Sequence, residues 1–228
     1  MTRPPHTRGC SVLDMPTILS SKKLSEPQRN LLLQAGIGLV EYNAIGIELV
    51  AFEVKGIIKN AIITSQNTVK GLVDKKVQIE NCFCVGEKTK AMLEANGIKV
   101  KVMTYYGKEL ADILVTGYAD KVFTFFCGNL RRDELPAKLR ENKIGFTEVE
   151  VYKTVLKSKK FERTFDGVLF FSPSAVESFT KENQLKNTTA FCIGTTTAAE
   201  AEKYTDKIII ATKPTIENVI VQVVKRLK

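Results

Sequence analysis

The sequence predicts an α/β protein built from two similar domains, each with a parallel sheet flanked by helices. From Pro16 onward, short apolar runs alternate with helical patterns, which is typical of parallel strands connected through helices. The apolar runs number roughly ten, and that many strands suit two small sheets better than one. Two motifs also recur in the second half of the chain, so we expect both sheets to follow one plan.

The expected strands are short apolar runs, and the expected helices fill the intervals between them. We expect strands at residues 17–20, 37–42, 61–64, 82–85, 99–103, 122–126, 148–154, 168–171, 190–193 and 207–210. We expect helices at residues 26–35, 88–95, 108–115, 133–140, 174–181, 198–203 and 216–226. Residues 1–15 have no periodic pattern and no apolar central region like that of a secretory signal, so we expect a disordered N-terminal extension there.

The internal repeat consists of two motifs that recur in the same order. ITSQNTV at residues 63–69 is similar to FSPSAVE at 171–177, and CVGEKTKAMLE at 84–94 is similar to CIGTTTAAEAE at 192–202. Both pairs are separated by nearly the same offset. Two motifs repeating at one offset indicate two similarly built α/β units.

Each repeated motif is an apolar strand that ends in a small or hydroxyl residue and runs directly into a helix. In a parallel sheet such junctions lie at the carboxyl edge of the strands, where ligands bind. Free backbone N–H groups and the helix dipole favour an anion there. Alternatively, Ser65, Ser172 and Thr196 simply cap their helices. The repetition of the junctions, together with net positive charge, favours anion binding.

The charge balance restricts the partners and the chemistry. The chain has 34 Lys and Arg against 25 Asp and Glu, a net charge of +9, which points to nucleic acid, a membrane surface or a multiply charged small molecule. The single histidine, His6, lies in the unpatterned N-terminal segment, which argues against a histidine base or a histidine-rich metal site. No apolar run approaches the roughly 20 residues that cross a membrane.

The five cysteines are scattered, and four of them lie in apolar runs: they are Cys10, Cys82, Cys84, Cys127 and Cys192. No pair has the C-x-x-C spacing that is typical of metal sites. We therefore expect small buried side chains in a reducing compartment, and a cytoplasmic location.

The segment FCGNLRRDELP at 126–136 places two arginines, Arg131 and Arg132, at the start of a helix. The N-terminus of a helix carries a partial positive charge, so cationic side chains are unfavourable there. Two interpretations are therefore open. The arginines bind a carboxylate or phosphate of a ligand, or they form surface ion pairs with Asp133 or Glu134.

The segment VEVYKTV at 149–155 alternates cleanly between polar and apolar residues. Tyr152 then shares a face with Glu150 and Thr154. A tyrosine in a strand usually belongs to a packed surface, so periodicity alone does not indicate a catalytic role.

The ordered set of these motifs resembles the uroporphyrinogen-III synthase family over residues 18–225. The resemblance is carried by ITSQNTV and CVGEKTK in the first half, followed by FCGNLRRDELP, VYKT, FFSPSAVESF, CIGTTTA and KPTIENVI. It implies two similar α/β domains with parallel sheets flanked by helices, joined by a two-stranded β ladder. The first domain would be discontinuous, residues 16–44 plus 156–228, and the second would be residues 45–155.

The resemblance also implies a reaction, the cyclisation of hydroxymethylbilane to uroporphyrinogen III with inversion of ring D and loss of water. This would make the protein a lyase of tetrapyrrole and heme biosynthesis, with no metal or organic cofactor. The partner would be a polycarboxylate tetrapyrrole, with no nucleic acid or membrane, and we expect a cytoplasmic monomer. The chemistry suits the composition, because positioning a flexible substrate matters more here than strong acid or base groups.

Carried over residue by residue, the resemblance implies one catalytic side chain, Tyr152, the tyrosine of the family's Val-Tyr-x-Thr, which would help the hydroxyl to leave. The implied substrate-binding residues are Thr64, Ser65, Gly86, Thr89, Gly128, Asn129, Arg132, Ser172, Pro173, Ser174, Ala175, Thr196 and Thr197. Arg131 could share the role of Arg132. Where family members often have an arginine after the first strand, this chain has Lys22 and Lys23, which lack the bidentate guanidinium.

Two other functions fit parts of the pattern. One is a non-catalytic anion-binding or sensor protein with two domains, which would use the same junctions without chemistry. The other is a nucleic-acid binder, suggested by the charge. Basic residues are spread among acidic ones, and no aromatic stacking motif or zinc spacing is present, so the second is disfavoured.

Overall fold

The computed structural model describes residues 15–228 and divides into two compact α/β units. Unit 1 comprises the described residues up to Gly46 together with Leu156–Lys228, and unit 2 is Ile47–Val155. The chain therefore starts in unit 1, passes into unit 2 and returns. The extension expected at residues 1–15 lies outside the described residues, apart from Met15.

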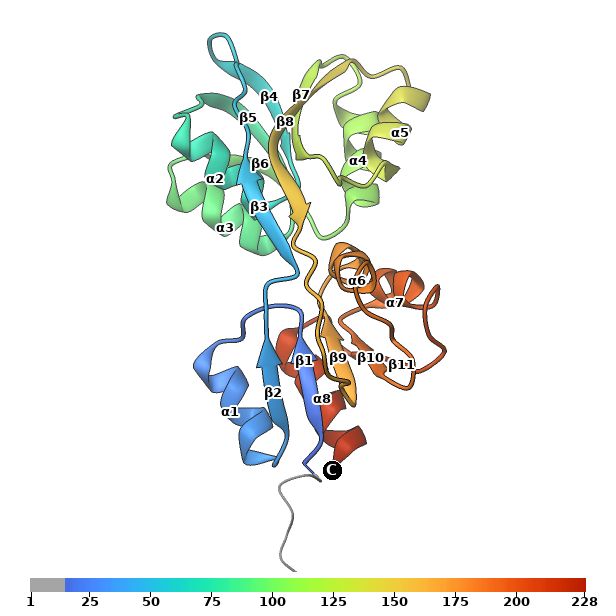
Figure 1. Ribbon diagram of the computed structural model, residues 1–228. Helices are drawn as coiled ribbons and strands as arrows, with labels where there is room; N and C mark the ends of the chain where they lie inside the picture. The colour runs from blue at the N-terminus through green and yellow to red at the C-terminus, as the bar shows by residue number, and fades with distance from the viewer. Residues whose placement is uncertain (1–14) are drawn as a thin grey trace, which may run out of the picture. The chain divides into compact units, whose positions relative to one another are not determined.

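Unit 1 contains a five-stranded parallel sheet with the order β11-β10-β9-β1-β2. Its elements are β1 (Thr17–Ser20), α1 (Glu26–Gln34), β2 (Gly38–Glu41), β9 (Gly167–Phe170), α6 (Pro173–Thr180), β10 (Thr189–Cys192), α7 (Thr195–Ala201), β11 (Ile208–Ile210) and α8 (Ile216–Leu227). Helices α6 and α7 pack in one apolar cluster and α1 and α8 in another, so both faces of the sheet are covered (Figure 1).

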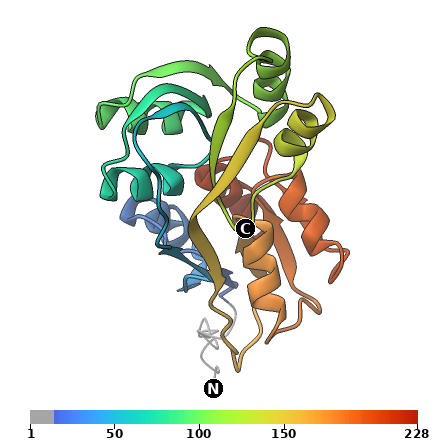
Figure 2. The ribbon, with the colours of Figure 1, turned by 90° about the horizontal axis from the view of Figure 1, so that it is seen from above.

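Unit 2 contains a six-stranded sheet with the order β3-β8-β7-β4-β5-β6. Its elements are β3 (Ile45–Leu49), β4 (Ile58–Ile63), α2 (Gln66–Asp74), β5 (Ile79–Val85), α3 (Glu87–Ala95), β6 (Val100–Thr104), α4 (Gly107–Gly117), β7 (Phe123–Gly128), α5 (Glu134–Glu141) and β8 (Phe146–Leu156). The strands from β4 to β8 are parallel. Helices α2 and α3 cover one face, and α4 and α5, green and yellow in Figure 2, cover the other.

The two crossings of the chain form a ladder. β3 is hydrogen-bonded beside β8, the Val50 N–H donates to the Val151 carbonyl at 3.0 Å, and the Lys157 N–H donates to the Ala44 carbonyl at 2.8 Å. The later residue of the β3 segment, Val50, bonds to the earlier residue of the β8 segment, Val151, and the earlier one, Ala44, bonds to the later one, Lys157. This order is the pattern of an antiparallel pair. β3 is absent from the strands expected from apolar runs, but the family resemblance implied a two-stranded ladder here; its side chains are half-buried or exposed.

Burial on both faces explains why the strands are almost continuously apolar. Phe83, Phe126, Phe170 and Phe191 are fully buried between sheet and helices. Each such side chain contributes about 1.5–3 kcal/mol to folding relative to an exposed one. The four cysteines in the described part of the chain are free and buried, as the sequence predicts.

The sequence repeat corresponds to the same positions in both sheets. Read from one edge, β6-β5-β4-β7-β8 of unit 2 matches β11-β10-β9-β1-β2 of unit 1. The strand-to-helix junction at Ser65 is thus equivalent to that at Ser172, and the junction at Gly86 to that at Gly194. The expectation of two similar α/β domains with parallel sheets is confirmed.

Candidate active site at the carboxyl edge of the unit 2 sheet

Tyr152 lies at the carboxyl edge of the unit 2 sheet, directly over Gly128 of the neighbouring strand. The two residues are register partners in β8 and β7. A Cβ atom built on Gly128 would lie 2.5 Å from Cε2 and 2.9 Å from Cε1 of the Tyr152 ring. Only a glycine leaves room for the ring in this position.

An irregularity in the β7–β8 register sets the direction of the Tyr152 side chain. Cys127 pairs with Glu150, but the next residue of β7, Gly128, pairs with Tyr152, so Val151 is an extra residue in β8. Such bulges bend the strand and redirect the side chains that follow. The regular alternation from Glu150 to Thr154, expected from the sequence, is therefore broken beside Tyr152.

The hydroxyl of Tyr152 lies against the start of α2. It donates a hydrogen bond to Ser65 Oγ over 3.2 Å, and the same Oγ accepts the Asn67 N–H at 3.1 Å. Ser65 is thus the N-cap of α2, as one interpretation of the sequence predicted, and it also holds the tyrosine. A hydroxyl has two acceptor lone pairs and one proton, so the Ser65 proton is left to point elsewhere.

These groups border a cavity of about 390 Å3 within unit 2. Four strand ends contribute to it, because parallel strands end at one edge of the sheet. Its wall consists of Thr64, Ser65, Val85, Tyr105, Tyr106, Gly107, Phe125, Gly128, Leu130, Arg131, Arg132, Glu134, Leu135 and Tyr152. The structure thus brings Thr64, Ser65, Gly128, Arg132 and Tyr152, all expected site residues, to one place.

Two tyrosines in the cavity wall, Tyr105 and Tyr106, were not anticipated from the sequence. Their side chains are 64% and 68% exposed, which is unusual for large aromatic residues. Both backbone N–H groups donate to the Glu109 carboxylate, at 3.1 and 3.2 Å, so the start of α4 already holds an anion from its own chain. The signal that could have found them is their position, directly after β6 and before α4.

The two arginines of the β7–α5 segment have different environments. Arg131 binds Glu148 through Nε at 2.8 Å and Nη2 at 2.7 Å, and binds Asp133 through Nη1 at 3.0 Å. Partial burial lowers the pKa of Arg131, but the carboxylates of Glu148 and Asp133 outweigh it, and the net shift is upward. The ion-pair interpretation is therefore confirmed for Arg131, with Glu148 as an unforeseen second partner. Arg132 is exposed and lines the cavity.

Asn129 lies outside this cavity wall. It borders a smaller hollow of about 300 Å3 with Cys127, Gly128, Arg131, Glu148 and Glu150. Its side-chain amide bonds to the backbone of Thr154, with Oδ1 accepting the N–H at 2.8 Å and Nδ2 donating to the carbonyl at 3.3 Å. Its expected contact with substrate stays a prediction.

The β5–α3 junction lies at the same sheet edge. Gly86 has a φ of 89°, a conformation that strongly favours glycine, and its carbonyl accepts the Thr89 N–H at 3.1 Å. The Thr89 side chain is only 5% exposed, so this threonine shapes the turn rather than the surface. Val85, just before the turn, reaches the cavity wall.

The equivalent junctions of unit 1 carry the remaining expected site residues. Ser172 caps α6, accepting the Ala175 N–H at 3.2 Å, and its hydroxyl lies 3.2 Å from that of Ser174. Pro173 occupies the first turn, where a missing N–H does no harm. Ala175 is buried.

At the next junction, Gly194 and not Thr196 is the N-cap of α7, which corrects the capping interpretation for Thr196. Thr196 is exposed, whereas Thr197 is 1% exposed and packs inside.

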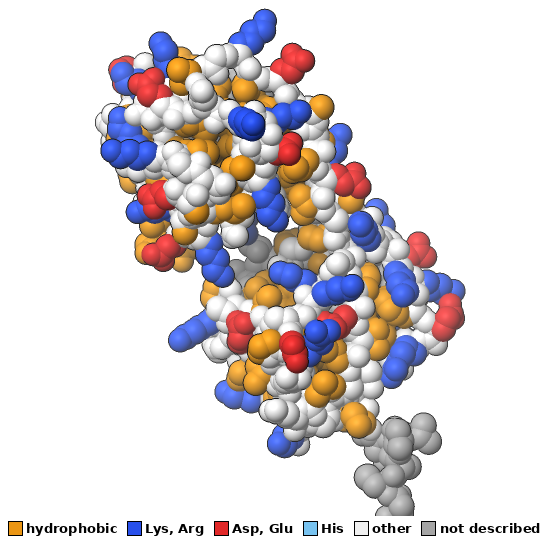
Figure 3. All heavy atoms as spheres, turned by 90° about the vertical axis from the view of Figure 1, so that its left-hand side faces the viewer, with side chains coloured by type: hydrophobic (Ala, Val, Ile, Leu, Met, Phe, Trp, Pro, Cys, Tyr) orange, Lys and Arg blue, Asp and Glu red, His pale blue; other side chains and the backbone are white. Residues whose placement is uncertain are grey.

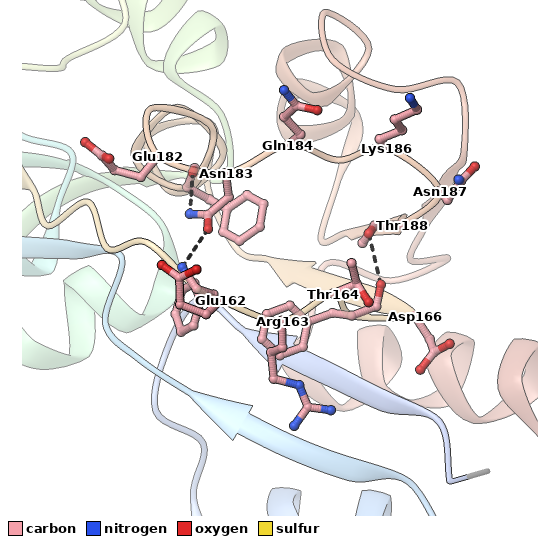
Figure 4. A pocket seen from close by; sticks show the side chains of 13 residues that line it. Glu162, Arg163, Thr164, Asp166, Glu182, Asn183, Gln184, Lys186, Asn187 and Thr188 are labelled. Atoms are coloured by element: carbon pink, nitrogen blue, oxygen red, sulfur yellow. Dashed lines mark hydrogen bonds between the residues drawn. The ribbon is translucent and has the colours of Figure 1, made fainter. Parts of the chain in front are cut away.

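A larger hollow of unit 1, about 690 Å3, is not at this edge. It lies between residues 161–166 and the segment after α6, next to the amino ends of β9 and β10 (Figure 4). Two of its polar side chains are engaged with backbone: Asn183 Oδ1 accepts the Phe161 N–H at 2.9 Å, and the Thr188 hydroxyl donates to the Phe165 carbonyl at 2.9 Å. This hollow has the larger volume, but the cavity at Tyr152 has the polar groups that converge on one space, so we take the cavity at Tyr152 as the candidate active site.

Other features of the described residues bear on cofactors and partners. Between residues 15 and 228, no three His, Cys, Asp or Glu side chains lie together as metal ligands would. Among the helices that the structure describes, none is both long and apolar enough to span a bilayer. On the face drawn in Figure 3, Lys and Arg are interspersed with Asp and Glu rather than gathered in one stripe.

Fold and site together define a two-unit α/β protein with a polar cavity at the carboxyl edge of a parallel sheet, the position where open α/β sheets bind their ligands. A family model described as uroporphyrinogen-III synthase HemD matches residues 28–220. The chain belongs to this family, so the resemblance seen in the sequence is confirmed.

Individual proteins are similar to part of this chain or to its fold. The chain is 32% identical over 99 residues to the porphyrin biosynthesis protein HemD of Ruminiclostridium josui, a match that covers 39% of this chain and only 20% of that longer protein. The uroporphyrinogen-III synthetase structure from Helicobacter pylori matches with a TM-score of 0.70 and 20% identity, covering 94% of this chain and 100% of that one. A mutant uroporphyrinogen III synthase from Thermus thermophilus matches with a TM-score of 0.63 and 12% identity, over 93% and 98% of the two chains. These structures share the fold.

Proposed function

We propose that the protein is a uroporphyrinogen-III synthase, a lyase that cyclises hydroxymethylbilane to uroporphyrinogen III with inversion of ring D and loss of water. The observation that carries the proposal is the hydroxyl pair of Tyr152 and Ser65, held at a cavity on the carboxyl edge of the unit 2 sheet. Family membership supplies the reaction class.

In the first step, the C–O bond of the hydroxymethyl group breaks, and the electron pair of the pyrrole nitrogen, which keeps its proton, forms a cationic azafulvenium. The departing oxygen takes one proton and leaves as water. Tyr152 donates to Ser65, whose own proton points elsewhere, so a proton can pass from Ser65 to the departing oxygen while Tyr152 replaces it. The proton released when the macrocycle closes returns to Tyr152, so both hydroxyl groups are protonated again.

The carboxylate arms of the bilane need donors. We propose that Arg132 and the junctions at Thr64, Ser65 and Gly86 bind arms in unit 2, and that those at Ser172 to Ala175 and Thr196 do so in unit 1. Helix starts and exposed guanidinium groups both favour carboxylates. Thr89 and Thr197 would hold the turns in shape, because their side chains are buried.

The exposed rings of Tyr105 and Tyr106 offer apolar faces for a pyrrole in the same cavity. The polar side chains of the cavity wall then remain available to bind the carboxylate arms of the substrate. It also fits a substrate that is flat and apolar at its rings but charged at its periphery.

The deciding experiment supplies freshly made hydroxymethylbilane, oxidises the product and resolves the porphyrin isomers. The bilane closes spontaneously to isomer I, so the expected result is isomer III formed faster than the spontaneous reaction. Isomer I alone, at the spontaneous rate, would refute the proposal. Tight binding of the bilane without turnover would instead favour the sensor alternative.

We further propose that the enzyme acts as a monomer in the cytoplasm and that its domains are residues 16–44 with 156–228, and 45–155. The division of the described residues at Gly46 and Val155 supports these boundaries. Light scattering across a concentration series tests the monomer. Expression of residues 45–155 alone tests the second boundary, since an autonomous domain should unfold cooperatively.

A further inference from the structure

Asn129 holds the segment of β8 that follows Tyr152. Its side-chain amide makes two bonds to the backbone of Thr154, and its own N–H donates to the Tyr152 carbonyl at 3.3 Å. These three bonds continue the β7–β8 pairing beyond Gly128, the last register pair. The side chain therefore does for Thr154 what a neighbouring strand would do.

The position of these bonds in the strand matters. Val151 is the extra residue of the bulge, so the regular ladder is interrupted just before Tyr152. Bulged strands can bend or shift register where the ladder is broken. Asn129 fixes the strand on the far side of that break, and Tyr152 lies between the two fixed points.

The amide of Asn129 is bonded through both its oxygen and its nitrogen to its own chain, which leaves one lone pair and one amide proton unused by these bonds. Its oxygen accepts the Thr154 N–H at 2.8 Å, a short bond, and one of its two amide protons is engaged by the Thr154 carbonyl. Asn129 is also missing from the wall of the cavity that Tyr152 lines. Its absence from that wall separates Asn129 from the residues placed to touch substrate.

We propose that Asn129 is a positioning residue that sets the place of the Tyr152 hydroxyl against Ser65, rather than a residue that contacts substrate. The proposal rests on the proposed function for its kinetic consequences. A displacement of a catalytic group by about 1 Å can cost a large factor in rate, because the reacting atoms must meet in one geometry. Loss of Asn129 should therefore act on the chemical step and leave substrate affinity nearly unchanged.

The kinetic test compares Asn129→Ala and Asn129→Asp with Tyr152→Phe and the double variant Asn129→Ala/Tyr152→Phe. We expect Asn129→Ala to lower kcat about tenfold with KM within about twofold, and to add nothing once the hydroxyl is absent. Asn129→Asp keeps the acceptor of the 2.8 Å bond and should retain more activity than Asn129→Ala. Effects that multiply in the double variant, or a raised KM with unchanged kcat, would overturn the proposal.

A matched control uses Asn142, whose Nδ2 donates to the Lys138 carbonyl at 2.9 Å at the end of α5. Asn142→Ala removes a side chain of the same type that is also bonded to backbone, and should leave kcat unchanged. A tenfold loss in this variant would mean that general destabilisation explains the effect of Asn129→Ala.

A second readout is independent of turnover. Amide hydrogen exchange of Thr154, and the ring signals of Tyr152 in protein with labelled tyrosine, report the strand directly. We expect faster exchange at Thr154 and shifted Tyr152 signals in Asn129→Ala but not in Asn142→Ala. If the wild type forms only isomer I, the proposed function fails, but these signals still decide whether Asn129 positions Tyr152. Unchanged signals would refute the positioning role.

Discussion

The ring of Tyr152 occupies the space that any side chain on Gly128 would fill. A Cβ atom at Gly128 would come within 2.9 Å of Cε1 and closer to two other ring atoms. The two residues face each other as register partners, so neither can move without disturbing the β7–β8 pairing. The Tyr152 ring can therefore keep its place at the site only if residue 128 is a glycine.

Gly128→Ala should displace the Tyr152 ring and break its bond to Ser65. We expect kcat for isomer III to fall by about tenfold or more, and the free energy of unfolding to fall by about 1–3 kcal/mol, as is usual for overpacking. Steady-state kinetics and urea denaturation measure the two effects. Gly117→Ala is the control, since nothing lies within 4 Å of a Cβ there. Full activity in Gly128→Ala would show that the ring position is irrelevant.

Ser65 combines two roles that substitutions can separate. Ser65→Asn keeps an N-cap acceptor for α2 but loses the hydroxyl, Ser65→Thr keeps both, and Ser65→Ala loses both. We expect activity to be retained only in Ser65→Thr, and stability to fall, by about 1 kcal/mol, only in Ser65→Ala.

Thr215→Ala provides the comparison for Ser65, because Thr215 caps α8 by accepting the Asn218 N–H at 3.2 Å. It should lose similar stability and keep its rate. An active Ser65→Asn would exclude the hydroxyl relay.

Much of the site follows from local sequence. Thr64 and Ser65 directly follow β4 and Gly128 ends β7, and parallel strands end at one edge, so their proximity was predictable from the alternation of strands and helices. Tyr152 joined them only through the family resemblance, because the bulge at Val151 is not visible in an alternating pattern.

Other features depend on contacts between distant residues. Arg131 contacts Glu148 through the pairing of β7 with β8, and nothing in the local sequence pattern distinguishes Glu148 from the other glutamates. The same holds for Asn129, whose partner is the backbone of Thr154. The edge strand β3 was expected only through the two-stranded ladder that the family resemblance implied, because its side chains are half-buried or exposed.

The exposed tyrosines of the cavity wall should contribute to substrate affinity. Tyr106→Ala and Tyr105→Ala remove aromatic faces worth about 0.5–1.5 kcal/mol each, so we expect KM to rise several-fold with a small effect on kcat. Exposure of 68% and 64% means that the free energy of unfolding should hardly change.

Tyr204, 46% exposed in unit 1 and outside this cavity, is the control, and Tyr204→Ala should leave KM unchanged. An unchanged KM in both Tyr105→Ala and Tyr106→Ala would exclude ring stacking at this wall.

The buried thiols make stability depend on alkaline pH. Burial raises the pKa of Cys82 to about 12, with a smaller contribution from Cys84, and burial raises that of Cys192 to about 12. A thiol whose pKa is raised on folding stabilises the folded state fully below its unfolded pKa, near 9. That stabilisation is lost as pH rises from about 9 through 12, because the unfolded chain releases the proton first.

Urea denaturation between pH 8 and 11 should therefore show a falling free energy of unfolding. The decline should be shallower in Cys82→Ala, which lacks one of the titrating groups. In a Cys10→Ser background, thiol reagents at pH 8 should react with the four buried cysteines only at the rate of unfolding. Rapid reaction in the folded state, or identical pH profiles for both proteins, would contradict the burial of these thiols.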